Sequence, residues 1–365
     1  MASVSALVAH LENLVPRSMQ ESYDNSGLLI GKMDAEVSGV LVCLDCIESV
    51  VDEAIEKGCN LIVAHHPLIF KGLKRITGSG YVERTVEKCI KNDIAVYAIH
   101  TNLDNYHAGV NAEIGRRLGL SDLKILAPKS EVLYKLIVFC PESEEAVLTE
   151  ALFNAGAGHI GNYSHCNFSS DGLGAFQPEP GSNPKVGERG KRTILEEKRV
   201  EFLVSQHRLN VVLSAMRSVL SYEEIAHDII KLSNSNQQEG SGMLGQLSEA
   251  VDAREFLKHV KDVFGCGAIR HTEILAKPVK TIAFCGGSGS FLLNNAIAAK
   301  ADVYITADFK YHEIFDADGQ IIIADIGHYE SEQFTSNLLV DILTKKFTTF
   351  AVRLSELNTN PINYL

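Results

Sequence analysis

Short apolar runs that alternate with helical segments are the feature that most constrains this chain of 365 residues. Each run has the length and β-branched content of a buried strand, and most of the segments between them repeat apolar residues at helical spacing. Strands that alternate with helices predict an α/β fold with largely parallel pairing. Polar or glycine-rich clusters directly follow most of the predicted strands. Because ligand sites in open α/β sheets form at the carboxyl ends of strands, these clusters are the candidate functional residues.

The pattern occupies both terminal parts of the chain. The predicted strands there are 40–44, 61–64, 94–99, 281–284, 303–305 and 320–324. The predicted helices there are 4–14, 47–57, 81–91, 253–263, 291–299 and 331–345. The first of these helices stands where a secretory signal would be, but it lacks a basic region and a continuous apolar core, so we do not expect a signal peptide.

The middle of the chain has a different character and is predicted to be an inserted domain. Its elements follow the order of a βαββαβ ferredoxin-like unit, an α+β fold. We expect strands at 133–139 and 200–204, helices at 144–155, 209–220 and 222–232, a loop at 167–192 and a polar linker at 233–242. The mixed-charge run 185–199 is expected to be a solvated loop. Three histidines of this region, His159, His165 and His207, belong to no tight ligand cluster.

Composition excludes several classes of partner. A formal net charge of −12 argues against a nucleic acid partner, because phosphate binding requires concentrated Lys and Arg. No stretch approaches the ~18 uninterrupted apolar residues of a membrane span, so no membrane partner is expected. The eight cysteines mostly stand singly in apolar surroundings, as reduced cytoplasmic thiols do. Cys43 and Cys46 form one C-x-x-C, whose structural role is favoured over a redox or zinc role.

Two adjacent histidines, His65 and His66, end the strand 61–64, and Pro67 stops it. Because neighbouring residues leaving a strand point in different directions, these imidazoles are suited to two neighbouring ions rather than one. The strand 94–99 leads into His100 and Asp104. Taken alone, Asp104 is as well explained as a helix or turn cap.

His328 and Glu332 are four residues apart at the start of a predicted helix. That spacing places both side chains on one helical face, about 5–6 Å apart at Cβ, as a chelating pair requires. An exposed surface pair is the alternative for these two residues considered alone.

Together, the five residues His65, His66, Asp104, His328 and Glu332 supply three imidazoles and two carboxylates. A carboxylate can bridge two ions while each ion takes one or two imidazoles, so the set suits two divalent ions about 3.5–4 Å apart. Zinc is the first choice, and iron or manganese also accept these ligands. No thiolate belongs to the set, which argues against a structural cysteine zinc site.

For two further motifs the sequence leaves more than one role open. The run Cys285-Gly-Gly-Ser-Gly lets backbone approach a ligand or an anion, or serves only as a tight turn. Asp308 and His312 are also four residues apart, but Lys310 between them disfavours a cation, so a substrate-facing or structural role is expected. No Arg/Lys cluster that would grip a triphosphate is expected beside the ligand motifs, where Lys71 and Lys310 are the only cations.

The motifs, read together, resemble one known family. The matching motifs are Tyr-Asp-Asn-Ser-Gly-Leu-Leu-Ile-Gly (23–31), Ala-His-His-Pro (64–67), His-Thr-Asn-Leu-Asp (100–104), Cys-Gly-Gly-Ser-Gly-Ser (285–290), Thr-Ala-Asp-Phe-Lys-Tyr-His (306–312) and Gly-His-Tyr-Glu-Ser-Glu (327–332). They look like those of the GTP cyclohydrolase 1 type 2 homolog family, the Nif-three-like dinuclear metal-centre proteins. Two departures, Tyr23 for a common tryptophan and Ala307 for a common glycine, do not involve a ligand position.

The resemblance implies two related α/β lobes, residues 1–128 and 238–365, that form one discontinuous domain with the metals in the cleft between them. It implies the same five ligands that the residue argument reached. It also implies a toroidal homohexamer, and residues 129–237 resemble the PII-like ferredoxin-fold insert of the longer members.

Two functions remain open from the sequence. The first is a metal-dependent hydrolase of an unknown small substrate of nucleotide-like kind, in which two ions lower the pKa of a water and His100 acts as acid or base. The second is a non-enzymatic metal-binding or regulatory hexamer whose insert senses a small ligand.

Overall fold

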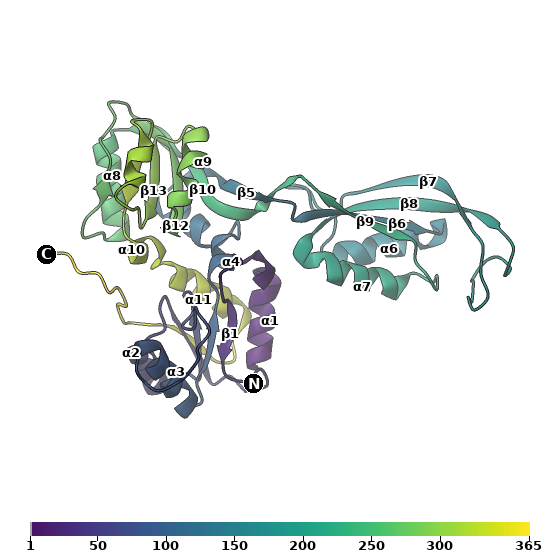
Figure 1. The fold of residues 1–365 in the computed structure, drawn as a ribbon, viewed down its shortest axis with the longest axis horizontal. Coiled ribbons are helices and arrows are strands. Elements are labelled where there is room, and N and C mark those ends of the chain that lie inside the picture. Colours follow the sequence, from purple (N-terminus) through teal and green to yellow (C-terminus); the bar gives the residue numbers. More distant parts are fainter. Residues whose placement is uncertain (1) are drawn as a thin grey trace. The chain divides into compact units, whose positions relative to one another are not determined.

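The computed structural model describes residues 2–365 as a mixed α/β fold with three sheets. The chain forms two compact units (Figure 1): unit 1 comprises Met1–Pro128 and Gln238–Leu365, and unit 2 comprises Lys129–Gln237. The chain leaves unit 1 within β5 (Ser121–Ser130) and returns to it within β10 (Ser235–Val251). The mixed α/β class that the sequence predicts is confirmed.

The first sheet of unit 1 has five strands in the order β1-β4-β3-β2-β15. These strands are β1 (Gly27–Ile30), β2 (Gly39–Cys43), β3 (Leu61–Ala64), β4 (Ala95–Ala98) and β15 (Ala351–Leu354). β15, β2, β3 and β4 run parallel, and only the edge strand β1 is antiparallel to its neighbour. The carboxyl ends of β2, β3 and β4 therefore share one edge of the sheet.

The second sheet of unit 1 has six strands in the order β11-β14-β13-β12-β10-β5. Besides β5 and β10, these strands are β11 (Arg270–His271), β12 (Val279–Ser288), β13 (Val303–Ala307) and β14 (Ile322–Asp325). β12, β13 and β14 are parallel, so their carboxyl ends also share one edge.

The helices of unit 1 cover these sheets. The longer ones are α1 (Val4–Leu14), α2 (Glu48–Glu56), α3 (Tyr81–Lys91), α5 (Val110–Arg117), α8 (Ala253–Phe264), α9 (Leu293–Ala298) and α11 (Thr335–Lys346). The short ones are η1 (Arg17–Met19), α4 (Thr101–Asp104), η3 (Ser290–Leu292), η4 (Glu313–Ala317) and α10 (His328–Glu332). None of the helices described in residues 2–365 has the length and apolar character that crossing a bilayer requires.

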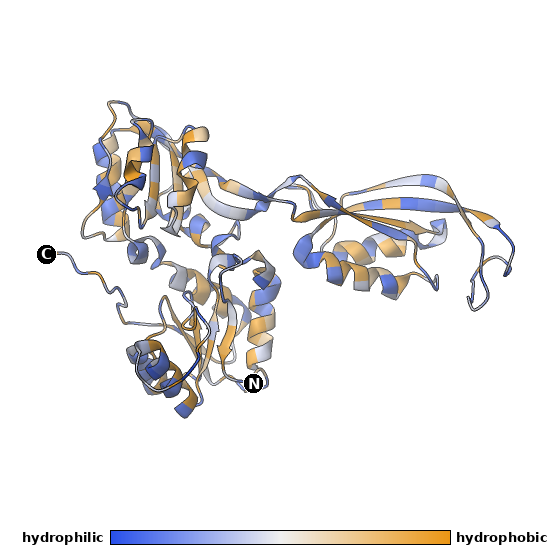
Figure 2. Cartoon of the chain, in the orientation of Figure 1, coloured by the Kyte–Doolittle hydropathy of each residue, from blue (hydrophilic) through white to orange (hydrophobic). Residues whose placement is uncertain are grey.

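Both faces of the central strands β2, β3 and β4 of the first sheet are buried, which explains why these strands read as continuous apolar runs. Successive residues of β2 alternate between two cores: Val40 and Val42 pack with α1, whereas Leu41 packs with α2 and α3. The core that contains Val40 also includes Phe284 of the second sheet, so it joins the two halves of unit 1. Figure 2 shows the mainly apolar central strands and the polar outer sides of the flanking helices.

Unit 2 has one antiparallel sheet in the order β7-β8-β6-β9. Its elements in chain order are β6 (Leu133–Cys140), α6 (Glu142–Asn154), β7 (Asn167–Phe176), β8 (Thr193–Ser205), η2 (Gln206–Arg208), α7 (Leu209–Val219) and β9 (His227–Leu232). Residues of α6 and α7 share a core with β6 and β8, for example Leu148 and Val212 with Leu136 and Phe202. Apart from η2, this is the βαββαβ order.

Some predicted element boundaries are wrong. The stretch 222–232 is predicted to be helical, but residues 227–232 form strand β9. Pairing with β6 overrides the local apolar spacing that suggested a helix. The predicted linker 233–242 mostly belongs to the long strand β10, and the predicted loop 167–192 begins with β7. The mixed-charge run 185–199, expected to be a solvated loop, belongs to strand β8 from residue 193 onward. The predicted helix 331–345 corresponds to two helices, α10 and α11, with a break at residues 333–334.

Two buried tyrosines of unit 1 allow a test of this core. Tyr97 in β4 is fully buried and its hydroxyl has no partner, whereas the buried hydroxyl of Tyr304 in β13 donates to the carbonyl of Gly289 (2.6 Å). We expect Tyr97→Phe to leave the free energy of unfolding unchanged or raise it by up to about 1 kcal/mol, because it removes an unsatisfied polar group. Tyr304→Phe should lower it by about 1–3 kcal/mol, since it leaves the Gly289 carbonyl unpaired.

Urea unfolding followed by circular dichroism measures both differences in one experiment. Equal losses of stability in the two variants would contradict the assignment of the Tyr97 hydroxyl as unpaired.

Candidate metal centre

Residues that follow the carboxyl ends of the parallel strands in both sheets of unit 1 meet in one cluster. Its members fall into those from the first half of the chain and those from the second. From the first half come Asp45 after β2, His65 and His66 after β3, and His100 and Asp104 after β4. From the second half come Asp308 after β13, and His328 and Glu332 on α10.

Backbone pairing fixes the two adjacent histidines. The N–H of His65 donates to the carbonyl of Cys43 (3.1 Å), and the N–H of His66 donates to that of Leu44 (2.9 Å). The ladder between β2 and β3 thus continues past the last strand residue. Pro67 has no N–H and ends it. The two side chains leave the backbone in different directions, and their ring centroids lie 5.0 Å apart.

Glu332 is the centre of the cluster. Its Oε2 lies 2.9 Å from Nε2 of His66 and 3.1 Å from Nε2 of His328, whereas its Oε1 lies 4.0 Å from Nε2 of His65. The carboxylate is 3% exposed, so its contacts are shielded from bulk solvent. Its two oxygens are therefore directed at different imidazoles.

Asp104 completes the other side of the cluster. Its Oδ1 lies 3.5 Å from Nε2 of His65, which is fully buried. Both atoms are buried and have no hydrogen-bond partner. A buried lone pair on each of two facing atoms is costly in a protein interior unless a cation or a proton lies between them. These two atoms are thus suited to share a metal ion.

Three groups of side chains bring ligand atoms within 4.8 Å of one another. They are His65 with Asp104 and Glu332, His66 with His328 and Glu332, and His65 with His66 and His100. The first two groups share Glu332 and together contain the five residues that the sequence predicts as ligands. None of the groups in residues 2–365 includes a cysteine.

Each of the three predicted imidazole ligands is oriented through Nδ1. His65 donates to the carbonyl of Ile99 (2.8 Å), His66 to Asp45 (2.7 Å) and His328 to Asp308 (2.6 Å). With its Nδ1 proton engaged, each ring presents Nε2 toward the carboxylates. Carboxylate and carbonyl groups hold metal-ligating histidines in this way.

The ionisation of the imidazoles follows their surroundings. Burial lowers the pKa of His65 to about 3, so its ring is neutral at pH 7. Burial opposes charge on His66 too, but hydrogen bonds to Asp45 and Glu332 raise its pKa to about 9. For His328, Glu332 and Asp308 outweigh burial and raise the pKa to about 11. The cluster therefore favours positive charge beside Glu332.

The two buried carboxyl groups behave differently. Burial and the nearby Glu332 raise the pKa of Asp104 well above its usual range. Burial acts in the same direction on Glu332, but His328 and His66 outweigh it and hold that pKa well below its usual range. Two carboxylates this close need added positive charge before both can ionise. A divalent ion supplies such charge.

Glycines let the backbone approach Glu332. Gly287 has a φ of +61°, and a Cβ there would lie 2.4 Å from Oε1 of Glu332. Gly327, at the start of α10, has a φ of +96°, and its Cβ would lie 2.2 Å from Oε2 of Glu330. Both positions need glycine for conformation and for space. The glycine run after Cys285 therefore accommodates the carboxylate of Glu332.

His100 lies against the cluster and is held by Asp24. Its ring centroid is 5.3 Å from that of His65 and 5.4 Å from that of His66. Its Nδ1 donates to Asp24 (2.8 Å), whose carboxylate also accepts hydrogen bonds from the backbone N–H and the hydroxyl of Thr101. Burial opposes ionisation of Asp24, but the hydrogen bonds from His100 and Thr101 lower its pKa strongly.

Several residues of the cluster were not assigned from the sequence. Asp45 and Asp24 have no predicted role, and Asp308 is expected only to be structural or substrate-facing, whereas each holds a histidine. The sequence signal available for them was their position next to a strand: Asp45 follows β2, Asp24 precedes β1 and Asp308 follows β13. His312 belongs to no ligand group in residues 2–365 and its ring instead contacts Tyr311. All eight cysteines are free.

Two cavities border the cluster. One of about 730 Å³ is lined by His66, His100 and His328 and by the chain end, including Asn360 and Tyr364. The other, of about 210 Å³, is lined by residues that include Tyr23, Asp104 and Glu332. The chain end is fixed near this site, because the hydroxyl of Thr359 donates to Asp45 (2.6 Å) and Asn360 donates to Glu330 (3.1 Å).

Comparison with known proteins places the chain among close relatives. The sequence profile described as Duf34/NIF3 (NGG1p interacting factor 3) matches residues 2–361. Proteins named GTP cyclohydrolase 1 type 2 homolog are similar: that of Halalkalibacterium halodurans is 39% identical over 100% of both chains, and that of Bacillus subtilis 38% over 98% of both. The crystal structure of a Bacillus cereus protein related to NIF3 is 37% identical, covers 100% of this chain and 99% of its own, and superposes with a TM-score of 0.87.

Asp24→Asn tests how His100 is held. The folded-state pKa of Asp24 is depressed, so its carboxylate stabilises the protein above the unfolded-state value of about 4, and that contribution is lost as the pH falls through the folded-state pKa. We expect the free energy of unfolding of the variant to be about 1–3 kcal/mol below that of wild type at pH 7. This difference in the free energy of unfolding should become smaller below about pH 4.

Urea unfolding at several pH values measures the deficit, with Asp34→Asn as a control at an exposed carboxylate. A deficit that does not change with pH would show that Asp24 acts through shape and not through charge.

Proposed function

The chain belongs to the Duf34/NIF3 family, and we propose that it binds two divalent metal ions that serve the hydrolysis of a small substrate. The observation that carries the proposal is the position of Glu332. One of its oxygens faces His65, and the other faces His66 and His328. A carboxylate shared in this way is the geometry of a bridging ligand.

The donor set supports two ions. His65, Asp104 and Glu332 would hold one ion, and His66, His328 and Glu332 the other. The unpartnered atoms Nε2 of His65 and Oδ1 of Asp104 are suited to the first ion, since a cation would satisfy both. Three imidazoles and two carboxylates suit zinc best, and iron or manganese also accept them.

The proposed chemistry combines these ions with His100. When bound, two divalent ions lower the pKa of water and stabilise developing negative charge on a substrate oxygen. His100 is the acid or base of the proposal, because Asp24 holds its Nδ1 and its ring faces both His65 and His66. Burial of Glu332 and His65 keeps bulk water from the ligand side of the centre.

The substrate of the proposal is a small, nucleotide-like molecule. Two relatives are named as homologs of a GTP cyclohydrolase, and the cavity of about 730 Å³ beside His66 and His328 has the volume of a small-molecule site. We further propose a toroidal homohexamer and a cytoplasmic location, the latter supported by eight free thiols.

A second function is a non-enzymatic metal-binding or regulatory hexamer whose insert senses a small ligand. The observation that favours it is a cavity of about 290 Å³ within unit 2, lined by residues that include Phe176, Lys185 and Tyr222. Unit 2 also has the strand and helix order of a ferredoxin-like fold, which supports the proposal of a PII-like insert at residues 129–237.

Metal content is the first test. Protein purified without added metal should carry about two metal ions per chain, as a dinuclear centre requires. The double variant His66→Ala/Glu332→Ala should lose both, because it removes the shared carboxylate. Elemental analysis measures the content. His312→Ala is the matched control and should keep the wild-type value, since His312 lies outside the ligand groups.

A content well below one ion per chain that does not rise on incubation with Zn²⁺ would overturn the dinuclear proposal. Equal metal loss in His312→Ala would show that the assigned ligand set is wrong.

Turnover separates the enzyme from the regulatory protein. Metal-loaded protein is assayed on a panel of nucleotides, pterins and phosphoesters. His100→Ala should keep its metals but lose about 10²–10⁴-fold in kcat, the usual contribution of a general acid or base. Asp104→Ala should lose metal and activity together. Absence of turnover on the whole panel by fully metallated wild type would favour the second function.

A further inference from the structure

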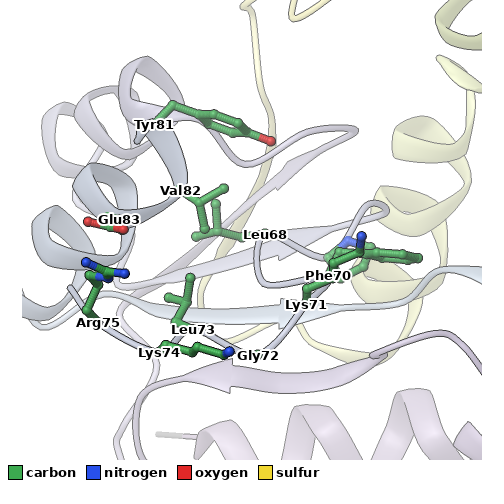
Figure 3. Close-up of a pocket in the computed structure, with 11 residues that line it drawn as sticks. Leu68, Phe70, Lys71, Gly72, Leu73, Lys74, Arg75, Tyr81, Val82 and Glu83 are labelled. Atoms are coloured by element: carbon green, nitrogen blue, oxygen red, sulfur yellow. The ribbon is translucent and has the colours of Figure 1, made fainter. Parts of the chain in front are cut away.

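A basic pocket lies next to the metal centre. The segment from Pro67 to Glu83 encloses a volume of about 560 Å³ between β3 and α3. Three cationic side chains line it: Lys71, Lys74 and Arg75. Figure 3 shows Arg75 beside Glu83 on one side of the pocket, Lys71 beside Phe70 on the other side and Lys74 below Leu73, with the apolar side chains of Leu68 and Val82 between them.

The three cations are not neutralised by the protein. Lys71, Lys74 and Arg75 are exposed, and none has an ion-pair partner within the described part of the chain. The pocket has one acidic residue, Glu83, whose carboxylate accepts hydrogen bonds from Thr77 and Ser79. The lining therefore has a formal charge of +2 in a chain whose net charge is −12. This local reversal of charge favours an anionic ligand.

The pocket adjoins the cavity of the metal centre. Pro67 and Phe70 line both spaces, and Pro67 directly follows His66. The ring of Phe70 lies 6.2 Å from that of His100, centroid to centroid. The start of the segment is anchored, since the amide of Asn25 donates to the carbonyl of Ile69 (2.6 Å). A ligand in the basic pocket would therefore contact Phe70, which also borders the cavity of the metal centre.

We propose that this pocket binds a phosphorylated part of the substrate through Lys71, Lys74 and Arg75, while the bond to be cleaved lies beyond Phe70 at the metal centre. The second half of this inference rests on the proposed hydrolase function. Three cations that line one pocket suit the several oxygens of a phosphate or polyphosphate group. The exposed apolar side chains of Leu73 and Tyr81 at the same pocket suit the organic part attached to it.

Pyrophosphate is the probe for the test, and isothermal titration calorimetry measures its affinity. The protein is titrated both loaded with Zn²⁺ and after removal of metal by a chelator. The variant Lys71→Ala/Lys74→Ala/Arg75→Ala should bind pyrophosphate about tenfold or more weakly in both forms, because it loses several charge-assisted hydrogen bonds. Its Zn²⁺ content should equal that of wild type.

A matched control removes as much charge elsewhere. Lys32→Ala/Lys258→Ala/Lys280→Ala changes three exposed lysines of unit 1 that line none of the described pockets, and should bind pyrophosphate as wild type does. Equal losses in the two triple variants would reduce the effect to net charge and overturn the proposal. Citrate should bind more weakly than pyrophosphate, and equal affinity would overturn the assignment of phosphate.

The outcomes also separate this inference from the dinuclear proposal. Suppose that Lys71→Ala/Lys74→Ala/Arg75→Ala binds pyrophosphate like wild type and that removal of metal abolishes binding by both proteins. The metal centre then holds the anion, and the proposal of a basic pocket fails while the dinuclear proposal stands. If no metal can be loaded, the dinuclear proposal fails. Pyrophosphate binding by the metal-free protein would still support the basic pocket, provided that this binding depends on Lys71, Lys74 and Arg75.

Discussion

The buried carboxylate of Glu332 is the contact on which the arrangement of both halves of unit 1 depends. It meets His66, which lies 266 residues earlier in the chain, at 2.9 Å, and His328 of its own helix at 3.1 Å. The contact with His328 is local to α10, but the contact with His66 forms only once the two sheets of unit 1 have assembled with the carboxyl ends of their parallel strands facing each other. The shared core, which contains Val40 of the first sheet and Phe284 of the second, holds them in that position.

A cluster of this kind is expensive to bury and must be supported from outside. An unpaired charge in a protein interior costs several kcal/mol, roughly, unless partners and hydrogen bonds satisfy it. Asp45 and Asp308 supply that support for His66 and His328, and the chain end adds to it, because Thr359 donates to Asp45. A fixed Nδ1 contact at each ring restricts its rotation, so the Nε2 atoms stay directed at the carboxylates.

The ligand groups and the cavities beside them lie within one of the two units. Every residue of the ligand groups, and every residue that lines the cavities beside them, belongs to unit 1. None of residues 129–237 contributes to the cluster. Unit 2 has its own core and its own cavity.

The sequence by itself determined the α/β class and most of the helices and strands of unit 1, and it singled out five of the eight residues of the cluster as candidate ligands. It could do so because strand length, helical spacing and the residues that end a strand are local properties. Local spacing misled at residues 222–232, where Ile229 and Ile230 suit a helix as well as the strand that pairing with β6 selects.

Tertiary structure alone decided which groups face one another. That Asp45 holds His66, that Asp24 holds His100 and that Glu332 directs its two oxygens at different imidazoles depends on contacts between residues far apart in the chain. The same holds for the three cations beside Phe70: their spacing in the sequence is visible, but the pocket that gathers them exists only once β3 and α3 are packed.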